Sequence, residues 1–178
     1  LTAAFPVLHG DDKREALCLL SFLNTPARFF APHLTAGEKN SMPDSIQPNL
    51  LILDEVDSTN TYAREHFDDL PDGTLVVARR QTAGRGRRGR SWLSPPGINF
   101  TGSILLKRLE DGFHAGCLLG VAALSLLREL APELPAYLKW PNDIYVENRK
   151  LAGLLSESAR IENGRVTAVV SGIGINVN

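Results

Sequence analysis

The sequence contains few of the residues that build metal sites, disulfide frameworks or nucleophile motifs. Two cysteines and four histidines occur in 178 residues, and neither group has the spacing of a metal-binding or catalytic motif. Cys117 lies in an apolar run, which is typical of a buried thiol. We therefore predict no metal ligands, and the scarcity of cysteine favours a reducing, cytoplasmic compartment.

The sequence also lacks a long hydrophobic run and an excess of charge of one sign. The longest uncharged apolar stretch, Ala115–Leu127, is shorter than the roughly 20 residues that cross a membrane, so it predicts a core helix and no membrane association. The net charge is −1, so the protein as a whole is not a polyanion binder. Positive charge is local, because six arginines fall between positions 79 and 90.

Two regions of the chain differ in composition. Residues 1–47 contain one helical pattern, Lys13–Leu23, and lead into the polar, proline-rich stretch 35–48, which is typical of a linker. No role is predicted for this segment. Residues 48–178 have sharper patterns and are predicted to form one domain. Because the chain ends at Asn178 directly after Gly-Ile-Gly-Ile-Asn, we expect it to be a fragment.

Strand patterns outnumber helical patterns in the second region. Helices are predicted from Asp57 to about Phe67 and over Phe113–Leu130. A hairpin is predicted across Asn163-Gly164. The predicted strands are 50–56, 74–79, 98–106, 137–140, 144–146, 151–158 and 166–171. Tight turns join several of them, so the pattern predicts an α+β fold with a mixed, largely antiparallel sheet and helices packed on it.

A glycine–arginine loop, Gly84–Arg90, is the most distinctive segment. Glycines let the backbone approach a ligand closely and arginines supply charge, which suits a small anion that carries phosphate. The segment also matches the dinucleotide pattern G-x-G-x-x-G, but Pro95, Pro96 and Gly97 deny the helix that this motif requires. A solvated basic loop or a nucleic-acid patch stays open, although the near-neutral total charge weakens the latter.

Three further segments have both a functional and a purely structural interpretation. Lys139–Asp143 and the later Lys150 could form a Lys–Asp pair across a hairpin, or could be a β-turn and an edge-strand lysine. Asp57–Asn60 could bind a small polar ring or merely cap a helix. Gly172–Asn176 could admit a nucleotide or simply end a strand.

Taken in order, six motifs resemble those of biotin–protein ligases over about residues 50–178: Asp57–Asn60, Gln81, Gly84–Gly89, Lys139–Asp143, Arg149–Gly153 and Gly172–Asn176. The resemblance implies a catalytic domain related to class II aminoacyl-tRNA synthetases. It also implies two reactions, in which biotin and Mg-ATP give biotinyl-5′-AMP and the biotinyl group then passes to a lysine of a carboxylase carrier domain. The small C-terminal β-domain of the family is missing from this sequence.

The resemblance also assigns roles to individual residues. The catalytic residues would be Arg87, which neutralises phosphate, Asp143, which orients or deprotonates the attacking lysine, and Lys150, which contacts the biotin carboxylate and the α-phosphate. The implied biotin-binding residues are Ser58, Thr59, Asn60, Gln81, Arg85, Gly86, Arg87 and Lys150. The implied nucleotide-binding residues are Arg88, Arg90, Trp92, Lys139, Asn142 and Asn176.

Two rival functions remain. A lipoate ligase or lipoyl/octanoyl transferase shares the fold, and a non-catalytic biotin-binding regulatory protein could be built on it. The arginine-rich loop and Lys139–Asp143 favour biotin, and the presence of Arg87, Asp143 and Lys150 favours an enzyme. Residues 1–47 are too short and lack the paired helices of a DNA-binding unit, so no DNA binding is predicted. A homodimer is possible.

Overall fold

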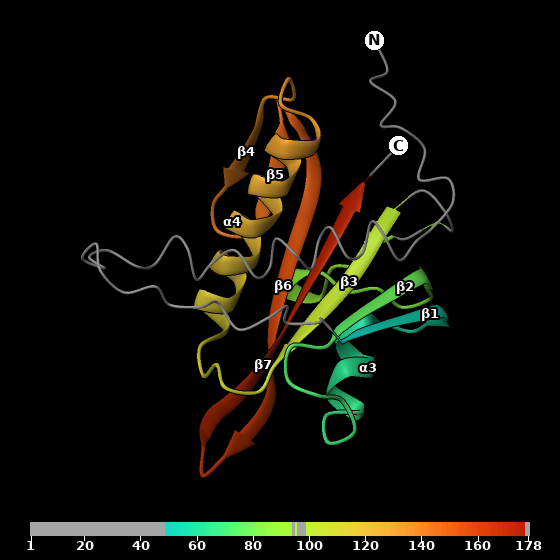
Figure 1. Ribbon diagram of the computed structural model, residues 1–178, viewed down its shortest axis with the longest axis vertical. Helices are drawn as coiled ribbons and strands as arrows, with labels where there is room; N and C mark the ends of the chain where they lie inside the picture. Colours follow the sequence, from blue (N-terminus) through green and yellow to red (C-terminus); the bar gives the residue numbers. More distant parts are fainter. Residues whose placement is uncertain (1–48, 94, 96–98, 177–178) are drawn as a thin grey trace, which may run out of the picture.

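The computed structural model describes residues 49–93, 95 and 99–176, so the predictions for residues 1–47 lie outside the described part. The described residues form a seven-stranded sheet with an α-helix on each face (Figure 1). This arrangement confirms the predicted α+β class.

The strands follow the predicted positions closely. The sheet order is β1-β2-β3-β7-β6-β5-β4, in which β1 pairs with β2 in parallel and every other neighbouring pair is antiparallel. The bounds are β1 (Leu50–Val56), β2 (Leu75–Gln81), β3 (Asn99–Leu106), β4 (Ala136–Lys139), β5 (Asp143–Val146), β6 (Arg149–Glu162) and β7 (Arg165–Asn176). The prediction of a mixed, largely antiparallel sheet is therefore confirmed.

The hairpin between β6 and β7 is longer than predicted. Its two-residue turn is Asn163-Gly164, with φ angles of 51° and 76°, the left-handed conformation that such a turn requires. The pairing continues to the turn, as Ile161 pairs with Val166 and the charged residues Glu162 and Arg165 pair with each other. A prediction from hydrophobic alternation alone misses this extension, because the backbone hydrogen bonds between the two strands continue beyond the residues that are buried.

The helices are α3 (Thr59–Glu65), which ends two residues before the predicted Phe67, and α4 (Gly112–Leu130). Asp111 caps α4, since its Oδ1 accepts hydrogen bonds from the backbone N–H groups of Phe113 and His114. The bond from Phe113 is the main cause that lowers the pKa of the Asp111 carboxyl. By length and composition α4 could cross a membrane, but seven of its residues are buried in the fold, as expected of a core helix.

The two faces of β7 carry different residues. Ile173 and Ile175 pack into the main core together with α4, whereas Val170 belongs to a smaller core with Ala63 of α3. Because successive side chains of a strand point to opposite faces, Gly172 and Gly174 share the face of Val170. The α3 face of the sheet is thus left without side chains at the centre of β7.

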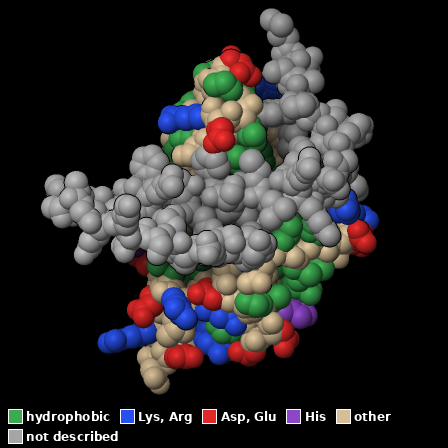
Figure 2. Space-filling model, viewed as in Figure 1, with side chains coloured by type: hydrophobic (Ala, Val, Ile, Leu, Met, Phe, Trp, Pro, Cys, Tyr) green, Lys and Arg blue, Asp and Glu red, His purple; other side chains and the backbone are tan. Residues whose placement is uncertain are grey.

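The surface shown in Figure 2 carries acidic and basic side chains close together, without one continuous basic area among the described residues. Nucleic-acid binding relies on a concentrated positive surface that neutralises several phosphates. The described atoms that are visible in this view do not provide one.

Replacement of Ile144 by alanine should strongly destabilise the fold. Ile144 of β5 is fully buried in the main core, so the change leaves a cavity and should lower the free energy of unfolding by about 2–5 kcal/mol. The matched control is Ile161→Ala on β6, where the side chain is 61% exposed and the expected change is within about 0.5 kcal/mol. Denaturant unfolding measures both, and equal effects would contradict the assigned core.

Candidate functional site

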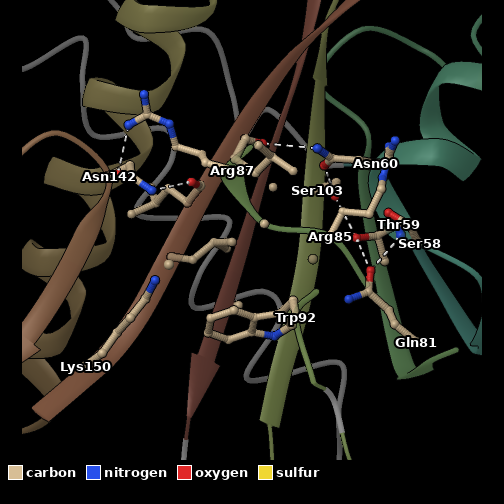
Figure 3. A pocket seen from close by; sticks show the side chains of 18 residues that line it. Ser58, Thr59, Asn60, Gln81, Arg85, Arg87, Trp92, Ser103, Asn142 and Lys150 are labelled. Atoms are coloured by element: carbon tan, nitrogen blue, oxygen red, sulfur yellow. Dashed lines mark hydrogen bonds between the residues drawn. The ribbon is translucent and has the colours of Figure 1, made fainter. Parts of the chain in front are cut away.

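A cavity of about 470 Å³, partly open to solvent, lies on the α3 face of the sheet. Its lining comes from segments that are far apart in sequence (Figure 3). The start of α3 and the end of β2 supply Ser58, Thr59, Asn60 and Gln81. The glycine–arginine loop covers the cavity with Arg85, Gly86 and Arg87, and Trp92, two residues after the loop, also lines it. The remaining lining includes Gly102, Ser103, Asn142, Lys150, Gly153, Gly172 and Gly174.

The start of α3 points polar groups into this cavity. Ser58 occupies the cap position of the helix but makes no side-chain capping bond; its backbone N–H instead donates to Asp57 Oδ1 at 2.6 Å. Gln81 Oε1 accepts from the backbone N–H of Thr59 at 2.8 Å and lies 3.1 Å from the Thr59 hydroxyl. The segment Asp57–Asn60 therefore begins a helix as predicted, with Ser58 at the cap position. The Ser58 hydroxyl does not cap it, and Gln81 from a neighbouring strand accepts the Thr59 N–H instead.

A buried hydrogen-bond chain continues from Thr59. Its hydroxyl lies 2.6 Å from Ser103 Oγ, which donates to Asn60 Oδ1, also at 2.6 Å. The amide nitrogen of Asn60 donates to the Leu155 carbonyl at 3.1 Å and to Glu157 Oε2 at 2.8 Å. Both amide hydrogens of Asn60 are thus used by the protein. Asn60 lines the cavity, but its amide nitrogen is committed to other residues.

The glycine–arginine loop folds back on itself at its base. Gly86 N donates to Arg90 O at 2.7 Å and Trp92 N donates to Gly84 O at 2.8 Å. Only a single 3₁₀ turn, Arg87–Gly89, lies between them, and the next strand, β3, runs antiparallel to β2. A dinucleotide-binding βαβ unit requires a helix and then a parallel strand, so the structure excludes that interpretation.

Two loop arginines reach opposite sides of the cavity (Figure 3). Arg87 Nη1 donates to Asn142 Oδ1 at 3.0 Å, and Arg85 Nη2 donates to Glu157 Oε2, also at 3.0 Å. The loop is therefore tied both to the β4–β5 connection and to β6. A guanidinium group held by a neutral amide, as in Arg87, keeps its full positive charge available to an anion.

The predicted approach of Lys150 to Asp143 is confirmed. The antiparallel pairing of β5 with β6 brings Lys150 Nζ to 2.8 Å from Asp143 Oδ1. The contact is an ion pair without hydrogen-bond alignment, and the buried Oδ1 accepts no hydrogen bond from the described residues. Lys150 lines the cavity, whereas Asp143 does not and reaches it through this contact.

The Trp92 side chain lies against the glycines of β6 and β7. A Cβ atom added to Gly174 would come within 2.5 Å of the indole, and one added to Gly153 would come within 3.0 Å of it. The indole Nε1 is buried and has no hydrogen-bond partner among the described residues. The close approach of Trp92 to the backbone explains why Gly174 carries no side chain.

Four of the proposed nucleotide-binding residues do not line the cavity, namely Arg88, Arg90, Lys139 and Asn176. Arg88 and Arg90 are exposed on the loop. The Lys139 ammonium lies 4.3 Å from the centre of the Tyr145 ring, and Asn176 Nδ2 donates to the Lys150 carbonyl at 3.2 Å. Trp92 and Asn142, from the same set, do line the cavity.

The sequence analysis missed two residues of the hydrogen-bond chain that starts at Thr59, namely Ser103 and Glu157. Ser103 is 1% exposed within β3, and Glu157 lies on β6 with a side chain that is 23% exposed. Neither belongs to a motif. The only available signal was a polar residue at an inward position of a strand, which becomes informative only when the neighbouring strands are known.

The chain belongs to the biotin/lipoate A/B protein ligase family, whose model matches residues 52–176. It is 39% identical over 158 residues to the bifunctional ligase/repressor BirA of Escherichia coli, with 79% of this chain and 48% of that protein covered. It is 42% identical over 130 residues to the biotin–[acetyl-CoA-carboxylase] ligase of Paracoccus denitrificans, with 71% and 53% covered.

Solved structures agree with this assignment. The biotin protein ligase of Aquifex aeolicus, in complex with biotin and ATP, matches with a TM-score of 0.62 and 41% identity over 73% of this chain and 53% of that one. The fold is therefore that of the biotin protein ligases. The chain spans about half the length of the relatives it matches.

Replacement of Gly174 by alanine should expel the Trp92 indole from its position. The new Cβ would overlap the ring, so the indole should become exposed and its fluorescence should shift to longer wavelength. Because the chain has two tryptophans, the measurement uses a Trp140→Phe background. Gly112→Ala, whose Cβ would have its nearest neighbour at 3.7 Å, is the control. An unshifted Gly174→Ala spectrum would contradict the packing.

Proposed function

We propose that the protein is an ATP-dependent biotin–protein ligase, which activates biotin to biotinyl-5′-AMP and transfers it to a lysine of a carboxylase carrier domain. One observation carries this proposal: uncharged hydrogen-bonding groups gather at one end of the cavity, where Arg85 is paired with Glu157, and two cations lie at the other end (Figure 3). Ser58, Thr59 and Gln81 form the first, and Arg87 and Lys150 belong to the second. A biotin molecule has a polar ureido ring at one end and a carboxylate at the other, which suits this division.

In the first reaction, a carboxylate oxygen of biotin attacks the α-phosphorus of ATP. The bond from that phosphorus to the bridging oxygen of the β-phosphate breaks, and pyrophosphate leaves. The Lys150 ammonium at the cationic end would hold the carboxylate near the α-phosphate and offset the negative charge that gathers there. Arg87, kept in place by Asn142, would neutralise the phosphate, and the covering loop would exclude water from the mixed anhydride.

In the second reaction, the amine of the carrier lysine attacks the biotinyl carbonyl carbon, and AMP leaves. The amine must lose a proton to act as a nucleophile. Asp143 would orient the incoming ammonium and accept its proton, and its contact with Lys150, which lines the cavity, supports this role.

ATP would enter with Mg²⁺ as its counter-ion. Trp92 and Asn142 line the cavity and would contact the nucleotide directly. Asn176 would lie near the nucleotide and its metal ion. Arg88, Arg90 and Lys139 lie outside the lining and would act on the phosphates through their charge at longer range.

The proposed partners follow from the two reactions. The macromolecular substrate is a biotin carboxyl carrier domain, and a cytoplasmic location fits a substrate that is made there. The proposal includes no DNA, no membrane and no fixed oligomeric state, and a homodimer is compatible with it.

Lipoate is the competing substrate, since the family name covers both acids. Its dithiolane ring cannot pair with the hydrogen-bonding groups of Ser58, Thr59 and Gln81, whereas the ureido group of biotin can. A site that hydrogen-bonds its substrate discriminates strongly against an analogue that lacks the matching hydrogen-bonding groups.

The full-length protein should catalyse ATP–pyrophosphate exchange that depends on biotin. The rate with biotin should exceed the rate with lipoate or octanoate by at least about a hundredfold, because a ureido ring can form hydrogen bonds at the polar end of the cavity and the other acids cannot. Exchange with lipoate alone would establish the competing function. Tight biotin binding without exchange would establish a non-catalytic regulatory protein.

Lys150→Gln should impair adenylation more than biotin capture. An ammonium near the reacting carboxylate and phosphate stabilises the transition state more than the ground state, so the adenylation rate should fall by about a hundredfold or more. The dissociation constant of biotin should rise by less than about tenfold. Rapid-quench kinetics and calorimetry measure the two quantities. Lys107→Gln, outside the cavity, is the control, and equal losses would assign Lys150 to ground-state binding.

A further inference from the structure

Glu157 joins three segments around the cavity without lining it. It lies on β6, two residues beyond Leu155 of the cavity wall. Its Oε2 accepts from Arg85 Nη2 at 3.0 Å and from Asn60 Nδ2 at 2.8 Å. Its Oε1 lies 3.7 Å from Arg64 Nη1 of α3. One carboxylate thus links the covering loop, the helix start and the central strands.

The contact with Arg85 is distinctive among the loop arginines. In the part of the chain that the structure describes, Arg85 is the loop arginine that pairs with a carboxylate, whereas Arg87 is held by the neutral amide of Asn142. A carboxylate neutralises the charge of Arg85 and directs its side chain toward β6. Arg87 therefore remains available for phosphate, while Arg85 acts as the attachment of the loop.

The contact with Asn60 acts on the other end of the cavity. Its amide nitrogen is drawn to Glu157 and to the Leu155 carbonyl, so the amide oxygen must face Ser103, from which it accepts at 2.6 Å. Ser103 in turn lies 2.6 Å from the Thr59 hydroxyl. The orientation of the proposed ureido-binding groups is thus coupled to Glu157 through a continuous chain of hydrogen bonds.

We propose that Glu157 is a positioning residue for biotin, which attaches the loop through Arg85 and orients the hydrogen-bonding end of the cavity through Asn60. This inference rests on the proposed function for the identity of the ligand, but the attachment of the loop is independent of it. Glu157 does not line the cavity, so its effect on catalysis is transmitted through the side chains of Arg85 and Asn60.

Glu157→Gln separates the two contacts. The glutamine retains an amide oxygen that accepts from Asn60, but it loses the charge that holds Arg85. In the full-length protein the KM for biotin should rise about fivefold to tenfold, as expected for one partly exposed charged contact. The KM for ATP and the thermal midpoint should stay close to wild type, because the fold keeps its other contacts. Equal increases in both KM values would indicate a general structural role and overturn the proposal.

The matched control is Asp68→Asn. Asp68 forms an ion pair at 2.6 Å with Arg160, another residue of β6, and neither lines the cavity. This variant also removes a carboxylate–guanidinium contact of β6. Because that contact lies away from the cavity, the KM for biotin should stay unchanged.

A second test combines Glu157→Gln with Arg85→Gln. In the Arg85→Gln background, Glu157→Gln should have almost no further effect on the KM for biotin. Additive effects of the two changes would contradict transmission through Arg85.

Limited proteolysis tests the attachment without any substrate. Trypsin cleaves after arginine, and a loop released from β6 should be cut about fivefold faster between Arg85 and Arg90, since cleavage follows the population of open states. Mass spectrometry identifies these sites in wild type, Glu157→Gln and Asp68→Asn. Unchanged cleavage in Glu157→Gln would overturn the attachment even if the enzyme uses biotin. Faster cleavage in a protein that shows no biotin-dependent exchange would preserve the attachment and reject only the proposed function.

Discussion

The antiparallel pairing of β6 with β7 is the contact on which the rest of the site depends. It aligns Gly153 with Gly174 and Leu155 with Gly172, so three of these four positions carry no side chain on the face of α3. The opposite face holds Ile173 and other residues of the main core. Because the side chains of a strand alternate between faces, one register creates both the hydrophobic core and the floor of the cavity.

Glycine is required at two positions of this floor, for a different physical reason at each. At Gly172 an added Cβ would lie 2.4 Å from the Asn60 amide oxygen, which the hydrogen bonds to Ser103 and Glu157 prevent from moving away. At Gly174 the obstacle is the Trp92 indole. The first close approach preserves the polar end of the cavity, and the second preserves the packing of the loop.

The ion pairs around the cavity fix the positions of side chains more than they stabilise the fold. Two carboxylates hold cations there, Asp143 at Lys150 and Glu157 at Arg85. Partly exposed ion pairs of this kind contribute only about 0–1 kcal/mol each to folding. Their larger effect is geometric, since each pair fixes a long, flexible side chain at the rim, while Arg87 keeps its charge for a ligand anion.

The sequence by itself determined the elements, and its resemblance to the biotin–protein ligases named most of the residues that line the cavity. Alternating apolar residues predict the strands because burial on one face demands a period of two, and Asn163-Gly164 predicts its turn because few residue pairs accept left-handed angles. The pairing of Lys150 with Asp143 was also predictable, since a short hairpin leaves little freedom in how it closes. Each of these inferences depends on residues that are close in the chain.

Only the tertiary structure decided which distant residues cooperate. Gln81 satisfies the start of α3 across 22 positions, and Glu157 reaches Arg85 across 72. Ser103 is a small polar residue in a strand, and nothing in its local sequence separates it from a surface serine. Such contacts depend on strand order and register, which arise from the packing of the whole sheet and leave no local pattern in the sequence.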